Sequence, residues 1–314
     1  MIDVIVARKQ TEADGISSFE LAREDGQPLP PFSAGAHIDV HLGAGRVRQY
    51  SLCNPVGEHL RYQIAVLREP ASRGGSQYLH EQLNEGDRLS IGEPRNLFAL
   101  DPAATHSLLF AGGIGITPIL CMAERLSHAG KSFELYYSVR SRDRAAFFER
   151  LQASPFATQV HLCCDDAEPL DARSVLANPD PGTHLYVCGP GGYMGYVLDS
   201  ARAQGWPEAR LHREYFSAAP EHQAPGNAFE IEIASSGDVL RVESDQSVID
   251  VLYDAGIEVP VSCEQGVCGT CVTRVLDGLP DHRDSFLTET QRAAGDLFTP
   301  CCSRAKSPRL ILDL

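Results

Sequence analysis

Four cysteines near the C-terminal end constrain this 314-residue chain more than any other feature. Three of them, Cys263, Cys268 and Cys271, have the spacing C-x4-C-x2-C, and Cys301 follows after 29 intervening residues. This spacing is typical of a plant-type [2Fe–2S] centre, in which four thiolates hold two irons. We therefore expect an iron–sulfur cluster with these four cysteines as its ligands.

Other interpretations of the same cysteines are a structural zinc site, buried core thiols or disulfides. Zinc sites usually take cysteines in closely spaced pairs rather than as three plus one. Gly266 and Gly269 favour the cluster, because they let the loop fold tightly and bring backbone N–H groups toward the sulfurs. Cys302 competes with Cys301 as the fourth ligand. We prefer Cys301, since neighbouring side chains of an extended segment point in opposite directions.

Composition narrows the function further. The formal net charge of −15 makes nucleic acid an unsuitable partner. The first seven residues have neither the basic start nor the apolar core of an export signal. The most apolar run, 108–123, is interrupted by glycines and a proline and is too short for a membrane helix. We expect a cytoplasmic protein with no membrane partner, whose thiols serve metals or chemistry or are simply buried.

Residues 1–101 are expected to form a small antiparallel β-barrel, because short alternating segments are separated by turn residues. Arg48 and Tyr50 lie on one face of such a strand, and Ser51 follows. A guanidinium can pair with a phosphate, and a tyrosine ring can pack against a flat ring. The run Arg73, Gly74, Gly75 and Ser76 precedes a helical segment and offers N–H groups and a hydroxyl to an anion. Together these residues predict a flavin phosphate site.

Residues 102–222 change character, because strands alternate with helices and thereby predict a parallel, doubly wound α/β sheet. The expected strands are 108–111, 134–139, 159–163 and 184–188, and the expected helices are 119–128, 145–153 and 172–177. In such sheets ligands bind beyond the carboxyl ends of the strands.

Two segments of this region stand at predicted strand ends. Gly113 and Gly115 would let a nucleotide phosphate approach the backbone, with Thr117 as the helix N-cap and Pro118 as the first helical residue. Cys188 ends another strand and is a candidate to lie beside a nicotinamide, although a buried core cysteine would look the same.

A linker at 223–227 separates this region from the last domain, 228–314, for which we expect a mixed sheet with one helix packed across it. Residues 281–290 are polar and are expected to form a surface loop. The last 87 residues carry 15 acidic and 7 basic side chains, a net charge of −8, which serves either solubility or steering toward a basic docking face.

The three predicted sites together imply a direction of electron flow. A nicotinamide nucleotide gives up two electrons at once, a [2Fe–2S] cluster takes one, and a flavin can stand between them. The chain would deliver single electrons to an acceptor elsewhere. The alternatives are a reductase that releases reduced flavin, for which a cluster is superfluous, and a non-catalytic zinc-stabilised binding module.

The whole chain resembles the phthalate dioxygenase reductase family, the flavin- and iron–sulfur-containing reductase components of two-component Rieske oxygenases. The resemblance rests on the four cysteines and on R-x-Y-S at 48–51, S-R-G-G-S at 72–76, G-G-I-G-I-T-P at 112–118, C-G-P at 188–190 and E-Y-F at 214–216. The segments 281–289 and 300–305 are most similar to the vanillate O-demethylase reductases of this family.

This resemblance implies a multidomain fold that consists of an antiparallel β-barrel flavin domain, an α/β nucleotide domain and an α+β plant-type ferredoxin domain. It implies FMN as the flavin, NADH as the electron donor and a Rieske-type oxygenase as the partner, acting on an aromatic acid such as vanillate or phthalate. It also implies that Arg48, Tyr50 and Ser51 surround the flavin and that Phe216 lies near flavin and nicotinamide. The same relatives lead us to expect NADH rather than NADPH, and Asp143 beside Ser141 and Arg142 would repel a 2′-phosphate.

Overall fold

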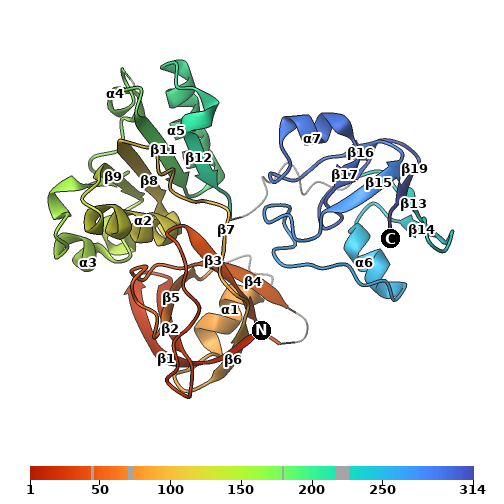
Figure 1. Ribbon diagram of the computed structural model, residues 1–314, viewed down its shortest axis with the longest axis horizontal. Helices are drawn as coiled ribbons and strands as arrows, with labels where there is room; N and C mark the ends of the chain where they lie inside the picture. The colour runs from red at the N-terminus through yellow and green to blue at the C-terminus, as the bar shows by residue number, and fades with distance from the viewer. Residues whose placement is uncertain (44–45, 70–73, 179, 217–225) are drawn as a thin grey trace. The chain divides into compact units, whose positions relative to one another are not determined.

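The structure is a computed structural model that describes residues 1–43, 46–69, 74–178, 180–216 and 226–314 (Figure 1). It divides into two compact units, Met1–Glu214 and Tyr215–Leu314. The first unit contains both the barrel and the α/β sheet, because one hydrophobic core continues from the barrel strands into the sheet. The second unit begins ahead of the linker predicted at 223–227, part of which lies outside the described residues.

The barrel is antiparallel and has the strand order β4-β3-β6-β1-β2-β5, with β7 paired to β3. Its elements are β1 (Ile2–Ala13), β2 (Ile16–Ala22), β3 (Ala36–His41), β4 (Val47–Ser51), β5 (Tyr62–Leu67), α1 (Gly75–Glu81), β6 (Arg88–Ile91) and β7 (Arg95–Asn96). A β-bridge between Leu52 and Ile64 joins the β4 end of the sheet to β5 and closes the barrel. The predicted barrel is therefore confirmed.

The second sheet of this unit is wholly parallel, in the order β10-β9-β8-β11-β12. Its elements are β8 (His106–Gly112), α2 (Ile116–His128), β9 (Ser132–Val139), α3 (Phe148–Gln152), β10 (Val160–Cys164), α4 (Ala172–Val175), β11 (Thr183–Cys188), α5 (Gly191–Ala203) and β12 (Leu211–Glu214). The chain runs outward from β8 in one direction and from β11 in the other. The gap between the carboxyl ends of β8 and β11 is therefore the topological switch point, where such sheets bind ligands.

Two local predictions in this sheet are wrong. Helix α2 begins at Ile116 after a 3₁₀ turn over Gly113–Gly115, so Gly115 rather than Thr117 occupies the N-cap. The Thr117 hydroxyl donates to the carbonyl of Ile114, 3.1 Å away, inside the helix. The helix expected over 145–153 is confined to Phe148–Gln152, because Phe147 adopts a left-handed conformation with φ of 59° just before it.

The second unit contains a mixed five-stranded sheet in the order β14-β13-β19-β15-β17 and a short pair, β16–β18. Its elements are β13 (Phe229–Ile233), β14 (Val239–Val242), α6 (Val248–Asp254), β15 (Thr273–Asp277), β16 (Pro280–Asp281), α7 (Glu289–Ala294), β17 (Leu297–Phe298), β18 (Arg304–Ala305) and β19 (Arg309–Leu312). Alternate residues of β13 pack with α6 residues such as Val248 and Leu252 in one core. The predicted mixed sheet with a helix across it is confirmed.

The surface loop predicted over 281–290 is wrong in its central part. Asp284 is fully buried, its Oδ2 accepts the backbone N–H groups of Phe286 and Leu287 at 3.0 and 2.7 Å, and helix α7 starts at Glu289. The polar composition of the segment conceals a buried hydrogen-bonded carboxylate. No helix in the described part of the chain is long and apolar enough to span a membrane.

Candidate functional site

A buried contact joins the barrel to the edge strand of the parallel sheet. Ser51, at the end of β4, donates its hydroxyl to Oε2 of Glu214, at the end of β12, over 3.1 Å. Strand pairing places Glu214 opposite Cys188, the last residue of β11. The predicted flavin residue Ser51 and the predicted nicotinamide residue Cys188 are thus brought to one carboxylate.

This carboxylate is not ionised at neutral pH. Burial raises the pKa of Glu214 to about 8, although the hydrogen bond from Ser51 opposes the shift. Burial raises the pKa of Cys188, and the Glu214 carboxyl, where it ionises, raises it further. The Cys188 side chain is fully buried, so the structure gives a protonated thiol in an apolar setting rather than a nucleophile.

His37 completes this interior from β3. It is paired with Ser51 in the barrel sheet, and its Nδ1 lies 3.9 Å from Oε1 of Glu214. Burial, followed by the charge of Arg95, lowers the pKa of His37 to about 4. Both His37 and Glu214 are therefore neutral near pH 7. The buried Nε2 of His37 has no hydrogen-bond partner among the described residues.

Two arginines and two glycines form the other end of the predicted flavin site. A side chain at Gly75 would come within 2.8 Å of Cγ of Arg48, and one at Gly74 within 2.7 Å of Nη1 of Arg46. Gly74 has φ of 87°, a conformation that favours glycine. Both guanidinium side chains therefore lie against the start of α1.

The remaining predicted flavin residues lie around this end. Tyr50 is half-buried and packs against the core, and burial raises its pKa, so its hydroxyl keeps its proton. The Ser76 hydroxyl accepts the backbone N–H of Glu69 over 3.2 Å. Arg73 lies outside the described residues, and its role stays a prediction.

The nucleotide turn and the second glycine-rich segment contact each other at the switch point between β8 and β11. A methyl group at Gly115 would lie 2.2 Å from the carbonyl oxygen of Cys188, and one at Gly112 would lie 2.7 Å from the ring of Tyr193. Gly113, with φ of 52°, has open space at the position of a side chain. The two predicted segments therefore share one site at the carboxyl ends of β8 and β11.

Three predicted residues are less directly placed. Thr117 and Pro118 are buried within the first turn of α2, so they support the glycine turn from the protein interior. Phe216 belongs to the second compact unit and is 39% exposed. Its predicted place near flavin and nicotinamide stays a prediction.

The four predicted cluster ligands lie in the second unit as two pairs of thiols. The Cys263 thiol interacts with that of Cys268, and the Cys301 thiol interacts with those of Cys271 and Cys302. The Cys263 and Thr270 side chains lower the pKa of Cys268 to about 5. Two iron atoms with two thiolates each require such a division.

Backbone groups of the cysteine loop already point at its sulfurs. The N–H of Gln265 lies 3.4 Å from Sγ of Cys263, and the N–H of Thr270 lies 3.5 Å from Sγ of Cys268. Gly266 and Gly269 adopt φ values of 69° and 70°, which fits the tight loop expected from them.

The reason given for preferring Cys301 over Cys302 is wrong. Residues around 300–302 form a turn, in which the Cys302 N–H donates to the carbonyl of Thr299 over 3.2 Å, and not an extended segment. The Cys302 sulfur instead lies 3.3 Å from the Thr299 hydroxyl, beside Gly266. Cys301 is the member of the pair that contacts Cys271.

Three residues of the site were not predicted individually. Glu214 carried a signal, because it begins the E-Y-F motif that supported the resemblance. Arg46 stands two residues before Arg48 on the same face, so its alternation could have been used. His37 has no local signal, since only the barrel register brings it to Ser51.

Comparison with known proteins agrees with this arrangement. Residues 231–306 match the family of 2Fe-2S iron-sulfur cluster binding domains, and residues 93–211 match the N-terminal domain of dimethylamine monooxygenase subunit DmmA-like proteins. The chain is 57% identical to the vanillate O-demethylase oxidoreductase of Pseudomonas sp. (strain HR199 / DSM 7063), over 100% of both chains. It is 40% identical to the heme-dependent oxidative N-demethylase beta subunit of Ectopseudomonas mendocina (strain ymp), over 100% of this chain and 99% of that one.

A solved structure shows the same architecture. Phthalate dioxygenase reductase, described as a modular structure for electron transfer from pyridine nucleotides to [2Fe–2S], is similar with a TM-score of 0.81 and 40% identity. The similarity covers 100% of this chain and 98% of that chain. The identities and the shared three-part fold leave one conclusion: this chain belongs to the phthalate dioxygenase reductase family of iron–sulfur flavoprotein oxidoreductases, which supply electrons to oxygenases.

Proposed function

We propose that this protein passes electrons from NADH through FMN and a [2Fe–2S] cluster to a Rieske-type oxygenase that demethylates vanillate. The observation that carries the proposal is the 57% identity to a vanillate O-demethylase oxidoreductase along the whole chain. The contacts described above support the assignment of each carrier to a set of residues.

The residues at the start of α1 fit the phosphate of FMN. Among the described residues, the buried Nε of Arg46 has no hydrogen-bond partner, although burying an unpaired donor is costly. Arg46 and Arg48 approach Gly74 and Gly75, where a side chain would occupy the space. A phosphate would accept a hydrogen bond from Nε of Arg46 and would balance the positive charges of Arg46 and Arg48. Tyr50, packed against the core nearby, is assigned to the flavin ring.

Ser51 and Glu214 form the proton-holding end of this site. When bound, FMN accepts two electrons together and releases them singly. The protonated Glu214 carboxyl and the Ser51 hydroxyl lie in one hydrogen bond, so they can hold a proton there without placing a charge in the interior. Gly113 leaves room for the nucleotide at the carboxyl ends of β8 and β11, Gly115 lets the turn pack against the Cys188 carbonyl, and buried Cys188 excludes water from this site.

The two cysteine pairs are assigned to the two irons. Cys263 and Cys268 would hold one iron, and Cys271 and Cys301 the other, because Cys263 interacts with Cys268 and Cys301 interacts with Cys271. The N–H groups that point at the Cys263 and Cys268 sulfurs stabilise the negative charge that reduction adds.

The choice of NADH rests on the turn after β9. Ser141, which follows β9 where a 2′-phosphate would be bound, donates its hydroxyl to Asp143 over 2.5 Å. This hydrogen bond lowers the pKa of Asp143 and keeps it ionised. The Arg142 guanidinium lies over the ring of Phe148, 4.7 Å from its centroid. The Asp143 carboxylate accepts the hydrogen bond of the Ser141 hydroxyl and would repel a 2′-phosphate. Asp143→Asn should therefore raise activity with NADPH relative to NADH.

A reconstituted assay tests the whole proposal. The flavin- and cluster-loaded protein is mixed with a purified vanillate-demethylating oxygenase, NADH and vanillate, and product formation is measured. We expect demethylation that requires all components and that free reduced flavin cannot replace. Product formation supported equally by free reduced flavin would identify a flavin reductase and refute the relay.

A second candidate partner is an oxygenase of another class. The full-length similarity to a heme-dependent oxidative N-demethylase beta subunit favours it, because reductases of one fold evidently serve unlike terminal enzymes. Steady reduction of a haem oxygenase, together with no transfer to the vanillate-demethylating oxygenase, would select this alternative.

A further inference from the structure

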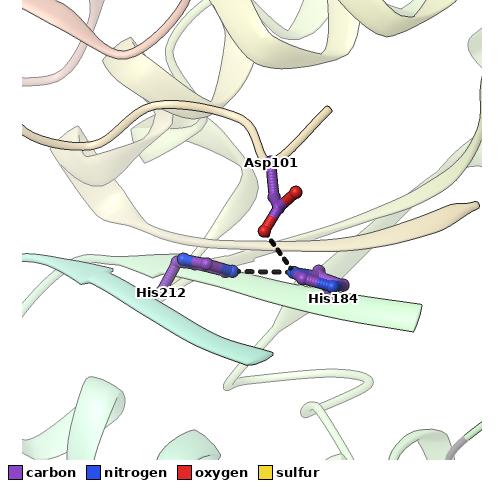
Figure 2. A group of neighbouring side chains, drawn as sticks. All are labelled: Asp101, His184 and His212. Atoms are coloured by element: carbon purple, nitrogen blue, oxygen red, sulfur yellow. Dashed lines mark hydrogen bonds and ion pairs between the residues drawn. The ribbon is translucent and has the colours of Figure 1, made fainter. Parts of the chain in front are cut away.

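Three side chains of unlike sequence position meet at the end of the parallel sheet opposite the glycine turns. His184 and His212 are the second residues of β11 and β12, and Asp101 lies in the connector between the barrel and β8 (Figure 2). Cys188 ends β11 four residues beyond His184, which corresponds to roughly 13 Å along a strand. The cluster is therefore separate from the nucleotide site.

The three donor atoms face one another. Nδ1 of His184 lies 2.9 Å from Nε2 of His212 and 3.7 Å from Oδ2 of Asp101, and Figure 2 shows both contacts. All three ligand atoms lie within 4.8 Å of one another. Imidazole and carboxylate ligands at 2.0–2.2 Å from a tetrahedral zinc ion are roughly 3.4 Å apart. Small side-chain rotations would therefore give all three the distances of one metal ion.

Surrounding residues hold these groups in place, as the neighbours of metal ligands usually do. The ring of Tyr186 stacks on His212 with centroids 4.5 Å apart, and its hydroxyl accepts the backbone N–H of Asp101 over 2.8 Å. The other carboxylate oxygen of Asp101 accepts the N–H of Ala103 over 2.8 Å, which turns Oδ2 toward the histidines.

A metal ion requires a neutral imidazole as its ligand, and the surroundings of His212 favour that form. Burial, followed by the charge of His184, lowers the pKa of His212 and favours the neutral ring. Only one proton fits between the two facing nitrogens, and a neutral ring can carry it on its outer nitrogen instead. The pair can therefore offer two lone pairs to a cation without losing a proton.

We propose that Asp101, His184 and His212 form a binding site for one divalent transition-metal ion of the zinc class, with water in the remaining position. Two imidazoles and one carboxylate are a ligand set that such ions prefer. The ion would lie between the two facing nitrogens and would balance the Asp101 charge.

Such an ion would fasten three segments together. β12 is the edge strand of the sheet and, among the described residues, pairs with β11 alone. Its far end carries Glu214, and the Asp101 connector leads out of the barrel. A metal at His212 would anchor the start of the strand whose end reaches Ser51. We expect the metal to raise the melting temperature of the first unit rather than to take part in electron transfer.

The test uses the flavin- and cluster-loaded protein with Zn²⁺ as the probe. Zinc binding is measured by titration calorimetry, and iron and sulfide contents are determined before and after. We expect one zinc per chain with iron retained. X-ray absorption at the zinc edge should give a nitrogen and oxygen shell at about 2.0–2.1 Å and no sulfur shell at about 2.3 Å. A sulfur shell, or no zinc bound while iron is retained, would overturn the proposal.

Variants locate the site. His212→Gln and Asp101→Asn keep the side-chain size, and each should weaken zinc binding by at least about tenfold, since even outer-shell changes cost that much. The matched control is His161→Gln, because His161 contacts a single carboxylate, Glu134, at 2.5 Å on the same sheet. Flavin absorbance checks that each variant is folded. Equal affinity in the wild type and both site variants would refute the assignment, whatever the stability of the variants.

Discussion

Replacing Glu214 with glutamine should remove a pH-dependent destabilisation of the first unit. Glutamine keeps the side-chain shape and can still accept the Ser51 hydroxyl, but it does not ionise. The Glu214 side chain is only 13% exposed, so its charge is poorly screened by water. The comparison therefore isolates the free-energy cost of one buried carboxylate.

The magnitude follows from the pKa. Burial raises the pKa of Glu214 from 4.5 to about 8, so the folded state holds its proton more tightly than the unfolded state. The contribution of Glu214 to the free energy of unfolding is fully present below its pKa in the unfolded state. This contribution is lost as the pH rises toward its pKa in the folded state. At ~1.36 kcal/mol per pH unit, the loss is about 2 kcal/mol at about pH 6 and about 4.5 kcal/mol at about pH 8.5. The free energy of unfolding of the wild type should therefore fall by about 2.5 kcal/mol over this pH range relative to that of Glu214→Gln.

The assay is the melting temperature of the Met1–Glu214 unit in the loaded protein at the two pH values. For a unit of this size the difference corresponds to about 5–10 °C. Glu208→Gln is the control, because the hydrogen bond from Arg202 lowers the pKa of Glu208 and leaves its contribution constant over this range. Wild type and Glu214→Gln melting curves that stay parallel between the two pH values would refute the reasoning.

Cys301→Ser should abolish electron delivery beyond the flavin while sparing NADH-driven ferricyanide reduction. Cys302→Ser should keep iron, sulfide and both activities. The reverse result would make Cys302 the fourth ligand in place of Cys301. Gly115→Ala should destabilise the first unit by about 1–3 kcal/mol in thermal melts, because the new methyl group meets the Cys188 carbonyl at 2.2 Å. Gly192→Ala, with open space in α5, should be neutral or slightly stabilising. Arg46→Gln should weaken FMN retention on gel filtration, and full flavin occupancy would contradict the phosphate site.

Much of the fold could be predicted because each element has a local cause. The parallel sheet follows from apolar strands that alternate with helices, and the barrel follows from alternation between turns. Failures occurred where tertiary contacts override local preference. Thr117 is a good N-cap by type, yet Gly115 takes the cap because its backbone must pass against Cys188. Helix α5 was hidden because it begins with Gly191 and Gly192, which usually signal a turn.

Only part of the candidate site could be predicted from the sequence, for the same reason. The cysteine spacing and the residues of β4 share one segment each, so their chemistry could be predicted from sequence. His37, Glu214 and Asp284 depend on pairing between distant segments, and their burial carries no local mark. Ionisable residues that a single-sequence interpretation assigns to the surface are here buried in the interior of each unit.

The two ends of the proposed relay use different means to stabilise added charge, and the chemistry explains why. Hydride transfer brings two electrons and moves a proton with them, so a titratable pair such as Ser51 and Glu214 suits that end. Cluster reduction adds one electron and no proton. A titratable group beside the ligands would couple the cluster potential to pH, whereas the fixed N–H groups of Gln265 and Thr270 would stabilise the charge without titrating. The proton therefore stays at the flavin end, and a single electron can leave alone.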